Sequence, residues 1–280
     1  MERFIYQNEM GNSIEFSIFS PYICTKITEN VSNSIVSTKH TNRDGESFES
    51  SALDTREINL QGSIVVNGYE EALERNFVRI LNPKLRSKLI CKKGMGQKEI
   101  DVELESLPTI KRNGGTIDFN IAFVGLNPYW RGLDKIEYLA LLKKKFTFPI
   151  VIPKNKGIIF GVKKSILETE IQNIGDVSTG FRVVFRARGE VQNVEVSNKF
   201  TNEKIKVNVS MQKGDTVEVI NYMNRKMVLF NGQKAFSKLD VQNSTFFSLL
   251  PGKNLLGYNA EKNAVNLDVI VYYSPLYLGR

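Results

Sequence analysis

The sequence predicts a mainly β protein built from two β-rich domains. Three observations predict this class: short segments of alternating apolar and polar residues recur along the chain, turn-forming pairs separate many of them, and a single stretch has helical periodicity. At 280 residues the chain is longer than a typical single domain. We therefore expect a first domain over residues 1–132, a linker or short helix over 133–150, and a second domain over 151–280.

The first domain is expected to be a β-sandwich or roll with one packed α-helix. Alternating apolar residues predict strands over 14–18, 56–64, 98–104 and 116–123, and residues 111–115 are typical of a hairpin turn between the last two. The helix is predicted from Tyr69 to Leu81, because apolar residues recur there at spacings of three and four. Asn67 is a candidate cap for its first turn, and Pro83 ends it. Such an apolar stripe needs a sheet to pack against.

The second domain is predicted to be all-β, a β-sandwich or jelly roll. Residues 205–211 and 265–273 alternate apolar and polar side chains over most of their length, as half-buried strands do. The pair Asn231-Gly232 suits a type I′ hairpin turn, and Pro251-Gly252 marks another turn. Many short strands with a turn about every ten residues are typical of a sandwich.

Charge is distributed unevenly between the two halves. Residues 1–133 carry 16 Lys and Arg against 17 Asp and Glu, whereas residues 134–280 carry 22 against 13, so the net charges are −1 and +9. A basic half could bind nucleic acid, an anionic glycan or an acidic protein surface. Alternatively, its lysines could simply be solvated. The asymmetry favours two units with different surroundings.

Motifs for catalysis, metal binding or cofactor binding are missing from the sequence. His40 is the only histidine and lies in a polar stretch without any Gly-x-Ser-x-Gly motif, which argues against a Ser–His–Asp triad and a zinc site. Cys24 and Cys91 are expected to be reduced thiols, although one disulfide between them remains possible in principle. No phosphate-binding loop, secretory signal or apolar run of membrane-spanning length is present. We expect no enzyme activity, no cofactor and no metal.

Several stretches together resemble one family, the distal tail proteins of siphophages that infect Gram-positive bacteria, with relatives in contractile tails and tail-like bacteriocins. In the first domain the likeness lies in Ser51–Gly62, in the following helix with Leu81-Asn82-Pro83, and in Phe123–Trp130. In the second domain it lies in these turns and the terminal segment: Asn173–Gly180, Lys213–Asp215, Asn231-Gly232, Leu250–Asn254 and Leu276–Gly279. The resemblance covers nearly the whole chain.

The resemblance implies a structural virion protein at the tail tip. It implies that the first domain assembles into a hexameric ring joining the tail tube protein to the tail-associated hub. It further implies that the second domain is a galectin-like or carbohydrate-module-like sandwich that can dock receptor-binding proteins or touch cell-wall carbohydrate. Such a protein is made in the bacterial host cytoplasm and resides in the virion tail or a tail-like particle. Sequence-specific binding of nucleic acid is not implied.

One hypothesis places part of the ring contact in the loop Lys39–Ser50, which overlaps the polar, turn-rich residues 38–46. This stretch is interpreted as a surface loop or the tip of a long hairpin, a polar excursion that no core requires. We therefore expect Lys39, His40, Arg43 and Asp44, with Arg56 in the strand that follows, to contribute to the contact between subunits.

A second hypothesis concerns the basic half. Lys143, Lys144 and Lys145 are expected to form part of a face that docks an acidic partner or an anionic wall polymer. The alternative function is a carbohydrate-binding adsorption protein, in which exposed aromatic side chains of the second domain grip cell-wall sugars. Tyr222 and Tyr258 of the second domain and Trp130 at the end of the first could stack on a sugar, and each could instead pack in a core.

Overall fold

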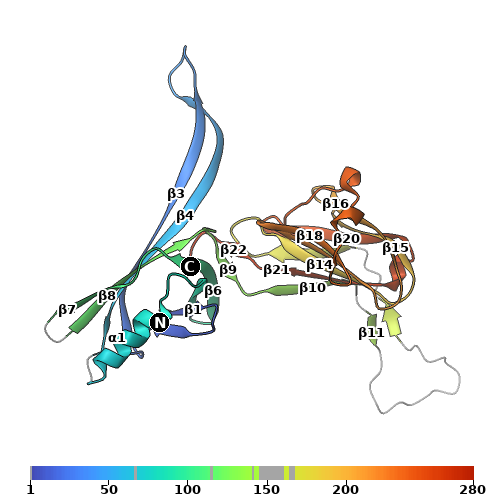
Figure 1. Ribbon diagram of the computed structural model, residues 1–280. Helices are drawn as coiled ribbons and strands as arrows, with labels where there is room; N and C mark the ends of the chain where they lie inside the picture. Colours follow the sequence, from blue (N-terminus) through green and yellow to red (C-terminus); the bar gives the residue numbers. More distant parts are fainter. Residues whose placement is uncertain (1, 66–67, 114–115, 141, 145–160, 164–167) are drawn as a thin grey trace. The chain divides into compact units, whose positions relative to one another are not determined.

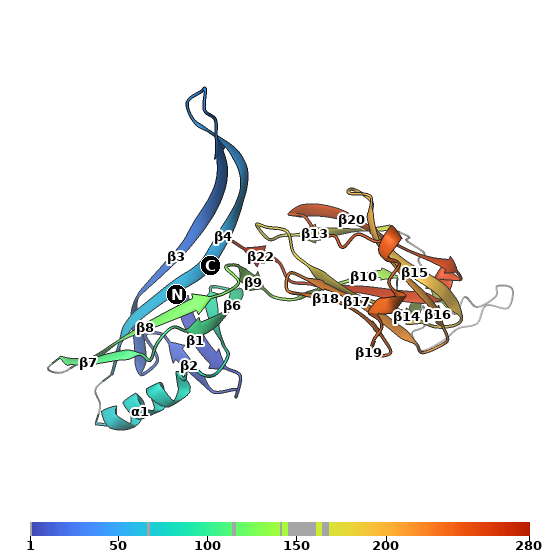
Figure 2. The same cartoon turned by 45° about the horizontal axis from the view of Figure 1, so that its top comes forward.

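A computed structural model describes residues 2–65, 68–113, 116–140, 142–144, 161–163 and 168–280 (Figures 1 and 2). The chain divides into two compact units. Unit 1 comprises Met1–Gly132 together with the C-terminal Tyr277–Arg280, and unit 2 comprises Leu133–Leu276. Both units are β-rich, which confirms the predicted fold class.

Most of unit 1 is one ten-stranded sheet, which closes into a roll. Its strand order is β22-β9-β6-β5-β1-β2-β3-β4-β8-β7. An additional pairing of β6 with β8 joins two strands that are far apart in this order, so the strands from β6 to β8 form a closed roll. The strands are β1 Glu2–Asn8, β2 Ser13–Phe16, β3 Tyr22–Lys39, β4 Glu46–Ile64, β5 Ser87–Lys93, β6 Gly96–Leu104, β7 Thr109–Asn113, β8 Thr116–Gly125, β9 Trp130–Gly132 and β22 Leu276–Tyr277.

The alternation in the sequence matches the inward faces of these strands. Ile58, Leu60 and Ile64 of β4 are buried, and residues 117, 119, 121 and 123 of β8 are buried beside them. Two expectations about this region are wrong. The strand that begins at Ser13 stops at Phe16, and Ile18 is exposed. Residues 111–113, predicted as a turn, belong to β7, which pairs with β8 at the edge of the sheet.

The predicted helix is present as α1, Glu70–Ile80. Its buried face centres on Phe77, whose ring lies 4.8 Å from that of Phe119 in β8 and 5.2 Å from that of Tyr22 in β3. Tyr69 was expected on the apolar face, but it occupies the N-cap position and its side chain is exposed and makes no capping hydrogen bond. Asn67, the predicted cap, lies outside the described residues.

Unit 2 is a β-sandwich, as predicted. One sheet has the order β10-β21-β14-β17-β18-β19 and the other β13-β20-β15-β16, and every pairing within them is antiparallel. Their inward-facing side chains form one core that includes Phe181 and Phe185. The strands are β10 Lys135–Ala140, β13 Glu168–Asn173, β14 Phe181–Ala187, β15 Val191–Asn198, β16 Glu203–Met211, β17 Thr216–Tyr222, β18 Arg225–Phe230, β19 Gln233–Lys234, β20 Gly252–Lys262 and β21 Leu267–Tyr273. A separate pair, β11 Leu142–Lys144 with β12 Gly161–Lys163, and three short 3-10 helices, η1 Phe236–Lys238, η2 Val241–Asn243 and η3 Ala264–Asn266, complete the unit.

The Asn-Gly turn predicted in unit 2 joins β18 to β19. Asn231 and Gly232 both have positive φ, 48° and 79°, as a type I′ turn requires. The Asn231 side chain adds two contacts, since Oδ1 accepts from the Thr216 N–H at 2.8 Å and Nδ2 donates to Asp215 at 2.9 Å. The turn therefore also ties the hairpin to the start of β17.

The chain between the two predicted domains differs from expectation. The helix option for 133–150 is wrong over residues 135–140, which form strand β10 at the edge of the six-stranded sheet. Pairing with β21 and burial of Leu139 and Ala140 favour a strand here, although Ile136, Leu139 and Ala140 have the spacing of a helical apolar face. At the other end, Tyr277–Arg280 belongs to unit 1 and not to the second domain.

Replacing Phe77 by alanine should destabilise unit 1. The side chain is fully buried among aromatic rings, so its loss leaves a cavity and should lower the free energy of unfolding by about 3–5 kcal/mol. Val78→Ala is the matched control, because Val78 is the next residue of α1 and is exposed. Chemical denaturation followed by fluorescence tests this, and equal effects of the two substitutions would contradict it.

Candidate assembly site

Unit 1 carries a long two-stranded arm, residues 31–55. β3 and β4 run for 18 and 19 residues and stay paired out to Lys39 and Glu46. Figures 1 and 2 show the two strands leaving the roll together and ending in a free tip. None of residues 31–55 is buried, and within the described chain no third strand pairs with this part of the ribbon. The arm therefore has no hydrophobic core of its own.

The arm is largely polar, but it exposes three apolar side chains. Ile35, Val36 and Phe48 are 62%, 52% and 67% exposed. Hydrogen bonds between its strands add to the backbone ladder, as from the Ser34 hydroxyl to both Asp54 carboxylate oxygens at 2.9 Å. A single isolated hairpin is marginally stable in water. The arm thus has the character of a surface that a partner completes.

The structure places four of the predicted contact residues at the tip. Lys39 ends β3, and Arg43 and Asp44 lie in the turn, all three exposed. His40 Nε2 lies 2.7 Å from the Ser47 hydroxyl oxygen, and Arg43 donates to the same oxygen at 3.3 Å. The stretch is thus the tip of a long hairpin, one of the two interpretations of the sequence.

Arg56 has a different location and role. It is only 5% exposed, and Nη1 lies 2.7 Å from a Glu29 carboxylate oxygen. Nε donates to the Pro128 carbonyl at 2.6 Å, and Nη2 donates to the Leu278 carbonyl. All the described contacts of its guanidinium lie within its own unit, so the structure gives Arg56 a role inside unit 1, and its contribution to a contact between subunits stays a prediction.

Glu29 and Arg56 form the centre of a cluster at the root of the arm. The Trp130 indole N–H donates to Glu29 at 3.1 Å, and Arg280 lies 3.4 Å from the other carboxylate oxygen. β3 and β4 are exposed from residue 31 outward, whereas Ile58 and Leu60 on the inner side are buried. The cluster therefore marks the point at which the roll ends and the arm begins.

The C-terminal residues are fastened to the same region. Lys98 donates to the Gly279 carbonyl at 2.8 Å and lies over the Tyr277 ring, and Arg280 lies over the Phe4 ring and 3.4 Å from Glu2. Nothing in the local sequence pattern marks these contacts, because each joins residues more than a hundred positions apart. They were missed for that reason.

The predicted docking residues of unit 2 are only partly described. The backbone of Lys143 and Lys144 lies in β11, and Lys145 lies outside the described residues. Two of the three aromatic residues considered for sugar binding are buried, since Trp130 is 0% and Tyr258 is 4% exposed, whereas Tyr222 is 38% exposed. Neither buried ring can stack on a sugar.

Neither a metal cluster nor a membrane-spanning helix occurs in the described ranges. Both cysteines are free, and Cys91 is buried. Burial raises the pKa of the Cys24 thiol, and burial together with the Glu2 carboxylate raises the pKa of Cys91 to about 12. Both thiols are therefore poor nucleophiles at neutral pH.

Comparison with known proteins identifies relatives of both units. Residues 10–124 match the phage tail protein RIFT-related domain, and residues 174–277 match the siphovirus-type tail component, C-terminal domain. No curated protein sequence matches the chain.

Solved structures share the fold over almost the full length. The phage SPP1 Dit protein, described as a paradigm of the hub adsorption apparatus in phages that infect Gram-positive bacteria, has a TM-score of 0.70 at 15% identity, with 98% of this chain and 99% of that chain covered. A chain of the phage p2 baseplate in its activated conformation with Ca has a TM-score of 0.53 at 14% identity, covering 98% and 97%. The corresponding baseplate with Sr gives 0.52 at 12% identity, covering 97% and 98%.

Breaking the buried ion pair at the arm root should destabilise unit 1. Arg56→Met leaves the Glu29 carboxylate without its closest cation and two carbonyls without a donor, at a cost of about 3 kcal/mol. Arg3→Met is the control, because Arg3 and Glu15 form an ion pair of 3.8 Å between half-exposed side chains, which contributes less than about 1 kcal/mol. Thermal unfolding of both variants tests the difference, and an Arg56→Met protein as stable as Arg3→Met would refute the assigned role.

Proposed function

Because this chain belongs to the siphophage distal tail protein family, a structural family of the phage tail, we propose that its copies assemble through unit 1 into a hexameric ring. In this proposal the ring joins the tail tube to the tail-tip hub and leaves a central channel open for DNA. The observation that carries the proposal is the arm, residues 31–55, which extends from the roll and pairs with no third strand among the described residues.

Physical chemistry supports contact between the arm and another subunit. Both outer strand edges of the arm present unpaired backbone groups, and such edges tend to pair or to be covered. Ile35, Val36 and Phe48 are apolar groups whose burial against a neighbour would stabilise the assembly. In a ring each subunit uses two different surfaces, one toward each neighbour, and the contact closes by rotation.

The tip residues belong to the same proposal. Lys39, His40, Arg43 and Asp44 provide charged and polar groups that suit the rim of an interface. Alanine substitutions at all four should weaken the ring, although less than loss of the apolar side chains. Intact rings in that variant would remove the tip from the contact.

Unit 2 is proposed to face partners outside the ring. Residues 133–276 carry 21 Lys and Arg against 13 Asp and Glu, a net charge of +8, and Lys238 and Lys226 lie over the rings of Phe230 and Phe246. A net positive charge of this size suits an acidic partner protein or an anionic wall polymer, and such binding weakens as salt rises. The alternative is carbohydrate binding. A glycan array probed with the full chain distinguishes the two. Binding of neutral sugars that is insensitive to salt would favour the alternative.

The arm proposal predicts a loss of assembly from surface substitutions alone. The triple variant Ile35→Ser, Val36→Ser and Phe48→Ser should raise the dissociation constant for assembly by more than about tenfold, because hot-spot side chains each contribute over about 1 kcal/mol. Sedimentation velocity across a concentration series measures this. The matched control is Val241→Ser with Val265→Ser, two comparably exposed positions in unit 2. Assembly of the triple variant with unchanged affinity would contradict the proposal.

A further inference from the structure

One edge of the unit 2 sandwich is closed by a segment that joins its two sheets. Strand β19 is the last strand of the six-stranded sheet, and β16 is the last strand of the four-stranded sheet. After β19 the Ala235 N–H donates to the Val228 carbonyl of β18 at 2.8 Å, and the Asp240 N–H then donates to the Lys206 carbonyl of β16 at 2.9 Å. Backbone hydrogen bonds therefore fix the segment to both sheets. We call residues Arg225–Phe246 the closing edge.

The closing edge is basic, and its cations are uncompensated. It contains 4 Lys and Arg against 1 Asp, a net charge of +3 within the +8 of residues 133–276. The carboxylate of Asp240 lies 4.0 Å from the ammonium of Lys206, outside the closing edge. The four cations are all exposed, and none has an ion-pair partner among the described residues: Arg225, Lys226, Lys234 and Lys238. This edge therefore concentrates the positive charge of unit 2.

Aromatic rings position two of these lysines. The Lys226 ammonium lies 5.2 Å from the centroid of the Phe246 ring, and the Lys238 ammonium lies 4.6 Å from that of Phe230. Both rings pack against the core of the sandwich, so they are held in place. A cation–π contact restrains an ammonium but supplies no negative charge to neutralise it. Two positive charges are thus placed in advance and stay available to an anionic ligand.

The kind of cation indicates the class of ligand. Three of the four cations are lysines, and lysine is depleted at protein–protein interfaces, where arginine is enriched. Lysine binds phosphate as a point charge, without the planar alignment that a guanidinium uses. The composition of the closing edge therefore favours a flexible chain of phosphates over the folded surface of an acidic protein.

The aromatic rings are poorly placed for stacking on bases or on neutral sugars. Such stacking uses the open faces of rings. Phe230 and Phe246 are only partly exposed, pack on the core and carry a lysine over one face. Phe236 is 48% exposed, and its ring is nearly parallel to that of Phe246 with centroids 6.4 Å apart. One exposed ring can contact the carbon chain between phosphates, but it is no platform for successive bases.

We propose that the closing edge binds a polymer with one phosphodiester in each repeat, such as a polyol phosphate of a bacterial cell wall. The inference rests on the proposal that unit 2 faces partners outside the ring, and it names the residues and the ligand class. Exposed charges bind weakly one at a time. A repeating polymer can engage several subunits of an assembly at once, which raises the overall affinity without any new contact.

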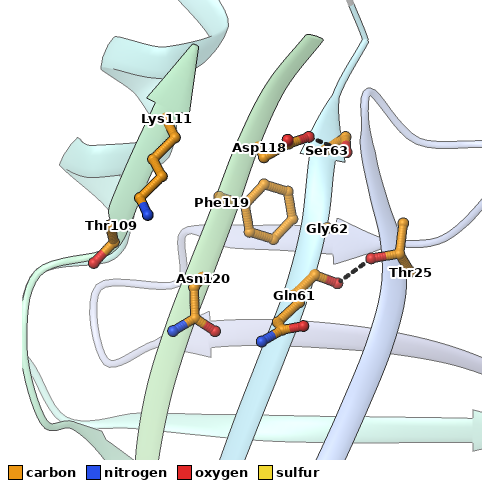
Figure 3. Close-up of a pocket in the computed structure, with 9 residues that line it drawn as sticks. All are labelled: Thr25, Gln61, Gly62, Ser63, Thr109, Lys111, Asp118, Phe119 and Asn120. Carbon is orange, nitrogen blue, oxygen red and sulfur yellow. Dashed lines mark hydrogen bonds between the residues drawn. The ribbon is translucent and has the colours of Figure 1, made fainter. Parts of the chain in front are cut away.

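The open hollow on the sheet of unit 1 lacks these properties (Figure 3). Its volume is about 520 Å³, and its lining contains one lysine, Lys111, and one carboxylate, Asp118. Hydrogen bonds from Ser63 at 2.7 Å and from Asn113 at 2.9 Å hold that carboxylate and lower the pKa of Asp118, so it is ionised at neutral pH. A polyanion therefore meets no net positive charge there, and Lys111 serves as a control position.

Titration of end-labelled poly(glycerol phosphate) with the full chain, followed by fluorescence anisotropy, tests the inference. The variant Lys226→Gln with Lys238→Gln should bind more than about fivefold more weakly, because it loses two uncompensated cations. The matched control, Lys199→Gln with Lys262→Gln, removes the same charge from two exposed positions beside the four-stranded sheet. This control and Lys111→Gln should each change the affinity less than about twofold. Equal losses in the two double variants would overturn the inference.

A second pair of substitutions tests the positioning of the lysines by the rings. Phe230→Leu with Phe246→Leu keeps apolar side chains on the core but removes both cation–π contacts. Binding should weaken about two- to fivefold, and this loss should disappear when Lys226→Gln and Lys238→Gln are also present. The same fractional loss in both backgrounds would contradict the role of the rings.

Three further polymers, compared at equal concentrations of charge or of repeats, separate this inference from the function on which it rests. Poly-glutamate, oligothymidylate and dextran should all bind more weakly than poly(glycerol phosphate). Tighter binding of poly-glutamate would overturn the ligand class and leave unit 2 as a docking site for an acidic protein. Tighter binding of oligothymidylate or of dextran would assign nucleic acid or neutral sugar instead. If no polyanion binds even at low salt, the inference and the proposed charge-based role of unit 2 both fail.

Discussion

The buried contact between Arg56 and Glu29 is the constraint on which unit 1 depends. A guanidinium that is 5% exposed must be compensated, and here one carboxylate and two carbonyl oxygens surround it. The same carboxylate accepts from the indole N–H of Trp130 in β9. One of the carbonyls belongs to Leu278, so the contact also holds the end of the chain. A single polar cluster thus joins the roll, the arm and the C-terminus.

This cluster explains how a long ribbon can leave a small domain in a defined direction. Inside the root, β4 pairs with β8 and buries alternate side chains; outside it, β3 and β4 pair only with each other. An arm fixed at its base loses less conformational freedom on binding than a free loop would. A preorganised but uncovered element is suited to assembly, which agrees with a structural role in the tail.

Much of the fold could be predicted from the sequence, because burial on one side of a sheet imposes a period of two. This period predicted β8, the inner half of β4 and several strands of the sandwich. The spacing of Leu73, Phe77 and Ile80 predicted α1. The arm has no such period, because neither of its faces packs on a core, so its length was not predicted. Residues 135–140 have helix-like spacing, and only pairing with β21 makes them a strand.

The assembly site was harder to predict, because its parts meet only in space. Lys39, His40, Arg43 and Asp44 were proposed from their polarity and turn character, and the structure places them at the tip of the arm. The internal contacts of Arg56 were not predicted, because burial of an arginine leaves no local pattern. A hollow on the sheet of unit 1 is lined from four strands, and its five lining residues from β7 and β8 lie more than forty positions beyond those from β4. Tyr277–Arg280 returns to unit 1 after the whole of unit 2, which no sequence window can reveal.

Hydrogen exchange measured on free and assembled protein tests the central claim most directly. Amides on the outer edges of the arm, residues 31–39 and 46–55, have no partner strand in the described part of the chain and should exchange quickly in the monomer. In the assembly a neighbour should cover them, so their exchange should slow while β14 and β21 in the core of unit 2 stay unchanged. Arm amides that exchange equally fast in both states would contradict the account.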